Sequence, residues 1–151
     1  MMAEPRFGRL ITAMVTPFTA DLELDLPRAQ ELALRLLDSG SEALVVCGTT
    51  GESPTVFYDQ KMELFRAVID AAGGRAPIIA NAGDNCTEDS VDFARKVVAP
   101  GVDAILAAVP YYNKTTNEGL DSHVPPNAET EEGQVALSTR PRRWTGQTGD
   151  E

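Results

Sequence analysis

Residues 48–53, which read Gly-Thr-Thr-Gly-Glu-Ser, combine side chains and a spacing that suit the binding of a small carboxylate. Two glycines bracket two threonines, so the backbone can turn sharply while its N–H groups and the threonine hydroxyls point toward one spot. An ordinary polar turn between a strand and a helix would have the same composition. The loop alone leaves both interpretations open.

A strand and a helix must position this loop. Residues 43–47, Ala-Leu-Val-Val-Cys, form a short apolar run rich in β-branched side chains, which is typical of a buried parallel strand. A helical pattern begins near Asp59. A loop between two such elements is predicted to lie at the carboxyl edge of a parallel sheet.

The alternation of strand and helix recurs along the chain. Strands are predicted at residues 10–16, 43–47, 77–80 and 104–109, and their starts recur about every 30 residues, the length of a βα unit. Helices are predicted between them, at about 26–39 with Asp25 as N-cap, from Asp59 to Gly73, and from a Thr87 cap to Gly101. A doubly wound sheet and an eight-stranded βα barrel both fit, although four units fill only about half of the roughly 250 residues of a barrel.

Residues 121–151 are a different kind of sequence. Glu, Thr, Gln, Arg, Gly and Pro dominate, and no helical or alternating apolar period can be traced. We therefore expect residues 1–120 to form the folded unit and residues 121–151 to form a tail of low order with no packed role. A recognition tail is the alternative interpretation.

Composition restricts the partners. Of the 151 residues, 42% are hydrophobic and 24% charged, a normal globular balance, while the net charge is −10. This acidity disfavours nucleic acid and anionic membranes, because no basic stripe can meet phosphates. No apolar run approaches the roughly 20 residues of a membrane span, and no signal peptide is recognisable, so we expect a cytoplasmic protein.

The two cysteines and the histidine do not form a metal-binding pattern. Cys47, Cys86 and His123 are widely separated, without the spacing of zinc ligands. Each cysteine is interpreted as a small buried or loop residue rather than a reactive thiol. We expect neither a metal ion nor another cofactor.

Four segments together resemble the dihydrodipicolinate synthase (4-hydroxy-tetrahydrodipicolinate synthase) family. They are residues 48–53, the run Pro-Tyr-Tyr-Asn-Lys at 110–114 with Glu-Gly-Leu at 118–120, Val-Thr-Pro-Phe at 15–18, and Ile79-Ala80 with Gly83 and Asn85. The resemblance runs from about residue 7 to residue 120. It implies an α/β fold, the first four βα units of a (βα)8 TIM barrel, followed by an unrelated tail.

This resemblance also implies a lyase activity. Members of the family condense pyruvate with aspartate semialdehyde in diaminopimelate and lysine biosynthesis, through a Schiff base between pyruvate and a lysine on strand six. On this chain, Thr50 would hold the pyruvate carboxylate through its hydroxyl and backbone N–H. Thr49 and Tyr112 would belong to a proton relay, in which a hydroxyl accepts and donates at once.

Further positions match the interface between subunits. The family forms homo-oligomers, dimers of dimers, and many members bind lysine as an inhibitor at the dimer interface. The matching residues are Ser53, Pro54, Tyr58, Lys61, Asn85, Asp89 and Tyr111. Inhibitable members tend to carry histidine, or another residue that tolerates a cationic ligand, where this chain has Lys61, so its ammonium is expected to repel lysine.

The chain also departs from the family pattern. Asn81-Ala82 replaces the more usual Gly-Thr, and Lys61, Lys96 and Lys114, the lysines of the chain, do not match the Schiff-base position. We therefore expect a truncated synthase that is inactive alone. The alternatives are another pyruvate-dependent class I aldolase, such as N-acetylneuraminate lyase, and a non-catalytic fragment that pairs with an intact synthase.

Overall fold

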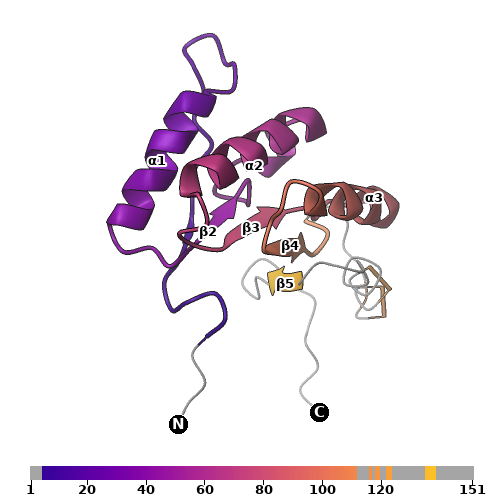
Figure 1. The fold of residues 1–151 in the computed structure, drawn as a ribbon. Helices are drawn as coiled ribbons and strands as arrows, with labels where there is room; N and C mark the ends of the chain where they lie inside the picture. The colour runs from indigo at the N-terminus through magenta and orange to yellow at the C-terminus, as the bar shows by residue number, and fades with distance from the viewer. Residues whose placement is uncertain (1–4, 112–115, 117, 120–121, 124–134, 139–151) are drawn as a thin grey trace.

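A parallel β-sheet is the frame of the computed structural model, which describes residues 5–111, 116, 118–119, 122–123 and the backbone of 135–138 (Figure 1). Its strands are β1 (Ile11–Ala13), β2 (Ala43–Val46), β3 (Ile78–Asn81), β4 (Ala104–Ala108) and β5 (Val135–Ser138). They lie side by side in sequence order, and every neighbouring pair is parallel. The carboxyl ends of all the strands therefore meet at one edge.

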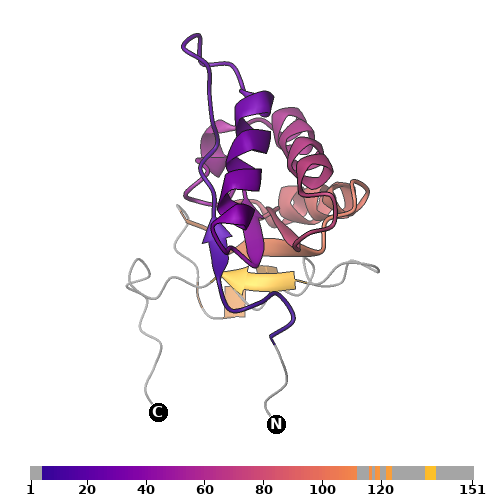
Figure 2. The ribbon, with the colours of Figure 1, turned by 60° about the vertical axis from the view of Figure 1, so that its left-hand side comes forward.

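Three helices cover one side of this sheet in both views of the ribbon (Figures 1 and 2). They are α1 (Leu26–Asp38), α2 (Tyr58–Ala72) and α3 (Thr87–Val98). In a doubly wound protein the strand order reverses and helices cover both faces. Sequential strands with helices on one side are instead the arrangement of a (βα) barrel, which confirms the predicted fold class.

Side chains of the strands alternate between two apolar clusters, as the two-residue period of a strand requires. The cluster toward the helices contains Leu44, Val46 and Ile105, together with Phe65 and Val68 of α2. The cluster on the opposite face contains Ala43, Ile79 and Ala104, with Phe7, Val45 and Leu106 packed against it. On this second face Ile11 and Val15 are 43% and 52% exposed, so the described residues leave it partly uncovered near β1.

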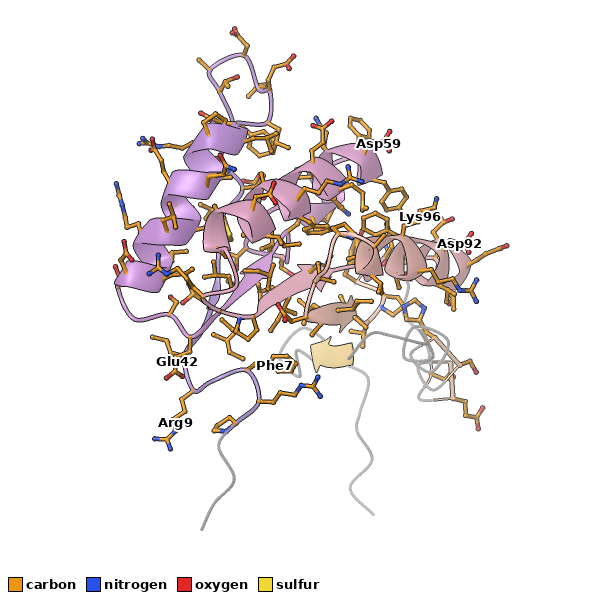
Figure 3. The ribbon with its side chains drawn as sticks, in the orientation of Figure 1. Phe7, Arg9, Glu42, Asp59, Asp92 and Lys96 are labelled. Carbon is orange, nitrogen blue, oxygen red and sulfur yellow. The ribbon has the colours of Figure 1, made fainter. Side chains whose placement is uncertain are left out.

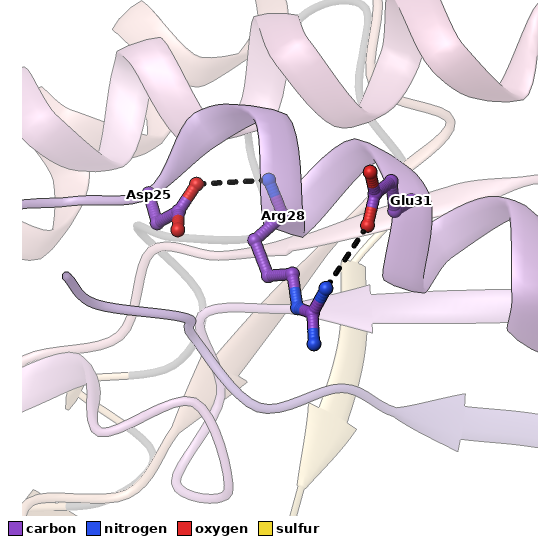
Figure 4. Close-up of polar contacts among 3 residues, drawn as sticks. All are labelled: Asp25, Arg28 and Glu31. Atoms are coloured by element: carbon purple, nitrogen blue, oxygen red, sulfur yellow. Dashed lines mark hydrogen bonds and ion pairs between the residues drawn. The ribbon is translucent and has the colours of Figure 1, made fainter.

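Helix α1 begins as its sequence predicts. The Asp25 carboxylate accepts a hydrogen bond from the backbone N–H of Arg28 at 2.9 Å, and the Arg28 guanidinium pairs with Glu31 at 3.2 Å (Figure 4). Such a cap satisfies one of the N–H groups that have no partner in the first turn. The predicted N-cap is confirmed.

The predicted start of α3 is wrong by one residue. Cys86 is the N-cap, without a side-chain hydrogen bond, and Thr87 is already helical. The Thr87 hydroxyl instead lies 2.7 Å from Nδ1 of His123, a contact between residues far apart in the chain. Such a tertiary partner cannot be read from local capping preferences.

Strand β5 corrects the expectation for the carboxyl-terminal segment. Val135–Ser138, which lie in the segment expected to lack regular structure, pair with residues 105–108 of β4.

None of the helices in the described residues has the length and apolar character that a membrane span requires.

Candidate functional site

The loop at residues 48–53 lies at the carboxyl edge of the sheet, directly after β2 and before a short 3₁₀ helix, η1 (Ser53–Thr55). The loops that follow β3 and β4 leave the same edge, because the three strands are parallel neighbours. This confirms the position predicted for the loop. It also brings the segments around Asn85 and Tyr111 to the same side of the protein, where Asn85 Oδ1 accepts a hydrogen bond from the Tyr111 N–H at 2.7 Å.

The loop satisfies some of its own backbone groups and leaves others open. The N–H groups of Gly51 and Ser53 donate to the carbonyl of Gly48 at 3.0 and 3.3 Å. Thr49 and Thr50 are exposed, and among the described residues nothing accepts a hydrogen bond from their N–H groups. Two adjacent donors and two hydroxyls are therefore accessible at the tip of the turn, a suitable arrangement for an anion.

Close packing fixes the base of the loop. A Cβ on Gly51 would lie 2.9 Å from the Cα of Cys47, closer than such atoms approach. The buried Thr16 hydroxyl donates to the Gly51 carbonyl at 2.6 Å, which ties the end of the β1 segment to the turn. Cys47 and Glu52 flank the turn with left-handed backbones, at φ 55° and 57°. This strained conformation is kept because the surrounding contacts determine it.

Cys47 is enclosed beneath the loop. Burial raises the pKa of its thiol, and the nearby Lys61 ammonium and the hydroxyls of Ser53 and Thr16 offset part of this effect. A thiol with a raised pKa is a poor nucleophile at neutral pH. The structure therefore agrees with the interpretation of Cys47 as a buried residue, whereas Cys86 is exposed.

The predicted interface residues do not all lie together. Tyr58, Asn85 and Tyr111 gather around Asp84: the Tyr58 hydroxyl donates to Asp84 Oδ2 at 3.0 Å, and the Tyr111 hydroxyl lies 3.4 Å from Oδ1. Ser53 instead faces Asn81, whose Nδ2 lies 2.8 Å from its hydroxyl. Two others, Pro54 and Asp89, are exposed, on η1 and in the first turn of α3.

Lys61 belongs with the first group but is buried, at 4% exposed. Its Nζ lies 5.2 Å from the ring centroid of Tyr58 and 5.7 Å from that of Phe93, and these two rings stack at 4.6 Å. Burial lowers the pKa of Lys61, while Cys47 and Asp84 act in the opposite direction. Ring faces attract a cation and offset part of its loss of hydration.

Both tyrosines of this group hold their protons more tightly than usual. Burial, followed by the hydrogen bond and the charge of Asp84, raises the pKa of Tyr58 to about 12. The pKa of Tyr111 is raised as well, by burial and then by Asp84. Both phenols therefore remain neutral hydrogen-bond donors at physiological pH.

Sequence reasoning missed Asp84 and the partner role of Asn81. Asn81 is the last residue of β3 and Asp84 lies in the loop that follows, and the departure from the family pattern at Asn81-Ala82 was the available signal. Tyr112, the predicted relay residue, lies outside the described residues, as does Lys114. In the portion that the structure describes, no three His, Cys, Asp or Glu side chains are grouped so that they could hold a metal ion.

The fold and this loop define the class: a protein built as the first part of a (βα) barrel, with its site at the carboxyl edge of the strands. A family model, described as the dihydrodipicolinate synthetase family, matches residues 6–148. The chain belongs to this family. The match continues beyond residue 120, where the resemblance was expected to end, so the expectation of an unrelated tail is corrected.

Individual relatives support the same assignment. A 4-hydroxy-tetrahydrodipicolinate synthase from Desulforudis audaxviator is 48% identical over 137 residues, which are 91% of this chain and 47% of the relative. The chain thus spans about half the length of the curated relatives it matches.

Solved structures agree in fold. A dihydrodipicolinate synthase from Cyanidioschyzon merolae, with lysine bound, superimposes with a TM-score of 0.87 at 41% identity, over 91% of this chain and 47% of that one. Another, from Acinetobacter baumannii and complexed with pyruvate, gives a TM-score of 0.84 at 34% identity, over 89% and 46%.

Proposed function

We propose that this chain supplies the keto-acid-binding part of a 4-hydroxy-tetrahydrodipicolinate synthase, which condenses pyruvate with aspartate semialdehyde in diaminopimelate and lysine biosynthesis. The observation that carries this proposal is the exposed pair Thr49 and Thr50 at the carboxyl edge of β2, whose hydroxyls are accessible and whose N–H groups have no acceptor among the described residues. A relative complexed with pyruvate supports the choice of ligand.

Each threonine has its own proposed role. The Thr50 hydroxyl and N–H bind the pyruvate carboxylate, because a carboxylate accepts several hydrogen bonds at once. Thr49 passes a proton between the substrate and Tyr112, since a hydroxyl can accept one hydrogen bond while it donates another. In the proposed homo-oligomer, Asp84 and the residues around it, Tyr58, Asn85 and Tyr111, lie at the subunit interface. Tyr111 is 56% exposed in the single chain.

The condensation requires a lysine amine that attacks the keto carbon. Lys61 does not suit this role, because its ammonium is buried against the rings of Tyr58 and Phe93. Lys96 is exposed on α3, one of the three helices that cover one side of the sheet (Figure 3). The third lysine, Lys114, lies outside the described residues and does not match the Schiff-base position of the family pattern. We therefore propose that the chain binds pyruvate without forming the Schiff base by itself. Borohydride treatment with pyruvate should leave the intact mass unchanged, and a covalent adduct would contradict this.

Calorimetric titration with pyruvate tests the binding role of Thr50. Thr50→Val removes the hydroxyl at nearly constant shape, and we expect at least a tenfold loss of affinity, because a hydrogen bond to a charged group contributes about 1.5–3 kcal/mol. The matched control is Thr55→Val, because the Thr55 hydroxyl donates to the carbonyl of Glu52, the N-cap of η1. Equal affinity in the wild type and in Thr50→Val would contradict the proposal.

The names of the relatives favour the synthase over another pyruvate-dependent aldolase. A non-catalytic fragment that pairs with an intact synthase remains a second proposal. It is supported by the exposed Ile11 and Val15 on the sheet face away from the helices. Co-purification with a full-length synthase tests it, and a chain that elutes alone when mixed with that enzyme would count against it.

A further inference from the structure

Asn81 connects two loops at the edge of the sheet that carries the site. It is the last residue of β3 and lies in register with Leu106 of β4. Because residues two apart in a strand share a face, Asn81 lies on the same face as Ile79, away from the helices. Its side chain is therefore at the carboxyl end of that face, beside the loop after β2.

The contact between Asn81 and this loop is direct and buried. Asn81 Nδ2 lies 2.8 Å from Ser53 Oγ, and it also reaches the Gly83 carbonyl at 3.5 Å. Asn81 is 3% exposed and Ser53 is 6% exposed. A buried hydrogen bond of this kind is costly to break, because the group left behind cannot turn to water.

Ser53 in turn fixes the shape of the loop. Its N–H donates to the Gly48 carbonyl, the same acceptor that Gly51 uses, and its hydroxyl contacts the thiol of Cys47. These bonds close the turn that presents Thr49 and Thr50. A side chain that fixes the position of Ser53 therefore also fixes the orientation of the N–H groups of Thr49 and Thr50.

We infer that Asn81 is a positioning residue for the carboxylate-binding loop, acting through Ser53 and without touching the ligand itself. This inference rests on the proposed binding of pyruvate at Thr50. It assigns a function to the position at which this chain carries Asn-Ala instead of the Gly-Thr expected from the family pattern. Glycine at this position has no side chain that could make the contact, so the inference applies to this chain in particular.

Amide hydrogen exchange on the full chain tests the inference without any ligand. In Asn81→Ala, the amides of Gly51 and Ser53 should exchange about tenfold faster, because the turn opens more often. Ser53→Ala should produce a similar acceleration at Gly51, and the double variant should be no faster than the faster single variant, as expected of two residues that act through one bond. Unchanged exchange at Gly51 and Ser53 in Asn81→Ala would overturn the inference.

Pyruvate titration supplies the second readout. We expect Asn81→Ala to weaken pyruvate binding about fivefold or more. Thr12→Val is the matched control, because it removes a 2.7 Å hydrogen bond to Ser41 at the opposite edge of the sheet. It should lower the thermal midpoint while leaving both the affinity and the loop exchange unchanged.

The outcomes separate the two proposals. If the wild type does not bind pyruvate, the proposed function fails, while the exchange experiment still decides whether Asn81 holds the loop. If the wild type binds pyruvate and Asn81→Ala binds it equally well, the positioning role fails and the proposed function stands. If Thr12→Val accelerates exchange at Gly51 as much as Asn81→Ala does, the effect is one of general stability and the inference is overturned.

Discussion

The ammonium of Lys61 lies 5.2 Å from the ring centroid of Tyr58, in a position that is only 4% exposed. Within the described residues Lys61 forms no ion pair, and its charge is compensated by the rings of Tyr58 and Phe93 together with the electrostatic effects of Cys47 and Asp84. A buried charge with so little compensation is expected to reduce stability. It is also one of the positions at which the sequence predicts a lysine-binding interface.

Lys61→Met should therefore stabilise the fold, by about 1 kcal/mol at pH 7, because a flexible apolar side chain replaces a buried ammonium. Burial lowers the pKa of Lys61 in the folded state, so the unfolded chain binds the proton more readily. Stability of the wild type should consequently rise with pH in the window below the ordinary lysine pKa of 10.5. Denaturant unfolding at several pH values checks both effects.

The control for this prediction is Lys96→Met, at an exposed position on α3, where the change should be within about 0.5 kcal/mol. A loss of more than about 2 kcal/mol in Lys61→Met would show that the ammonium contributes to the fold instead of weakening it.

Free lysine should bind this chain weakly. Two ammonium groups about 5 Å apart repel by about 3 kcal/mol at an effective dielectric constant of 20, which corresponds to about a hundredfold in affinity. Lys61→His should recover part of this affinity at alkaline pH, where histidine is neutral. Calorimetric titration with lysine is the measurement, and tight binding by the wild type would contradict the expected repulsion.

Asp84→Asn should lower the pKa of Tyr58. Burial is the largest cause of the rise to about 12, but the hydrogen bond and charge of Asp84 also contribute, and only the latter two depend on a carboxylate. The wild type should lose stability between pH 10 and 12, because the unfolded tyrosine ionises before the folded one. Tyrosinate absorbance gives the titration, with Tyr58→Phe to assign the signal. An unchanged curve in Asp84→Asn would contradict the assigned contribution of Asp84.

Much of the fold could be predicted from local patterns, and the exceptions have physical causes. The Asp25 cap of α1 and the Gly73 end of α2, where φ is 55°, depend on neighbouring residues only. The burial of Lys61 could not be predicted, because it depends on rings supplied by two helices. Strand β5 was missed because its pairing with β4 depends on residues distant in the sequence.

The candidate site was predictable only in part, because some of its contacts join residues that are distant in the sequence. Its place at the end of β2 follows from the order of strand, loop and helix. The bonds that fix the loop come from Thr16, in the segment after β1, and from Asn81, at the end of β3, and they became visible only in three dimensions.

Gly51→Ala should be among the more damaging changes at the site. The added Cβ would meet the Cys47 backbone at 2.9 Å, and overpacking of this kind costs about 1–3 kcal/mol. Gly48→Ala should cost less, because its Cβ would meet the Val45 side chain at 3.2 Å and side chains can shift. Thermal unfolding of the two variants compares them directly. An equal loss of stability in both variants would show that close contact with the Cys47 backbone is not the reason that position 51 requires glycine.

The proposed binding of pyruvate at the turn after β2 is tested most directly by recording the backbone amide spectrum of the labelled chain during titration with pyruvate. The account predicts saturable shifts at Thr49 and Thr50, larger than those at Thr55, and no such shifts with acetone, which has no carboxylate. Shifts confined to other parts of the chain, or equal shifts with acetone, would contradict it.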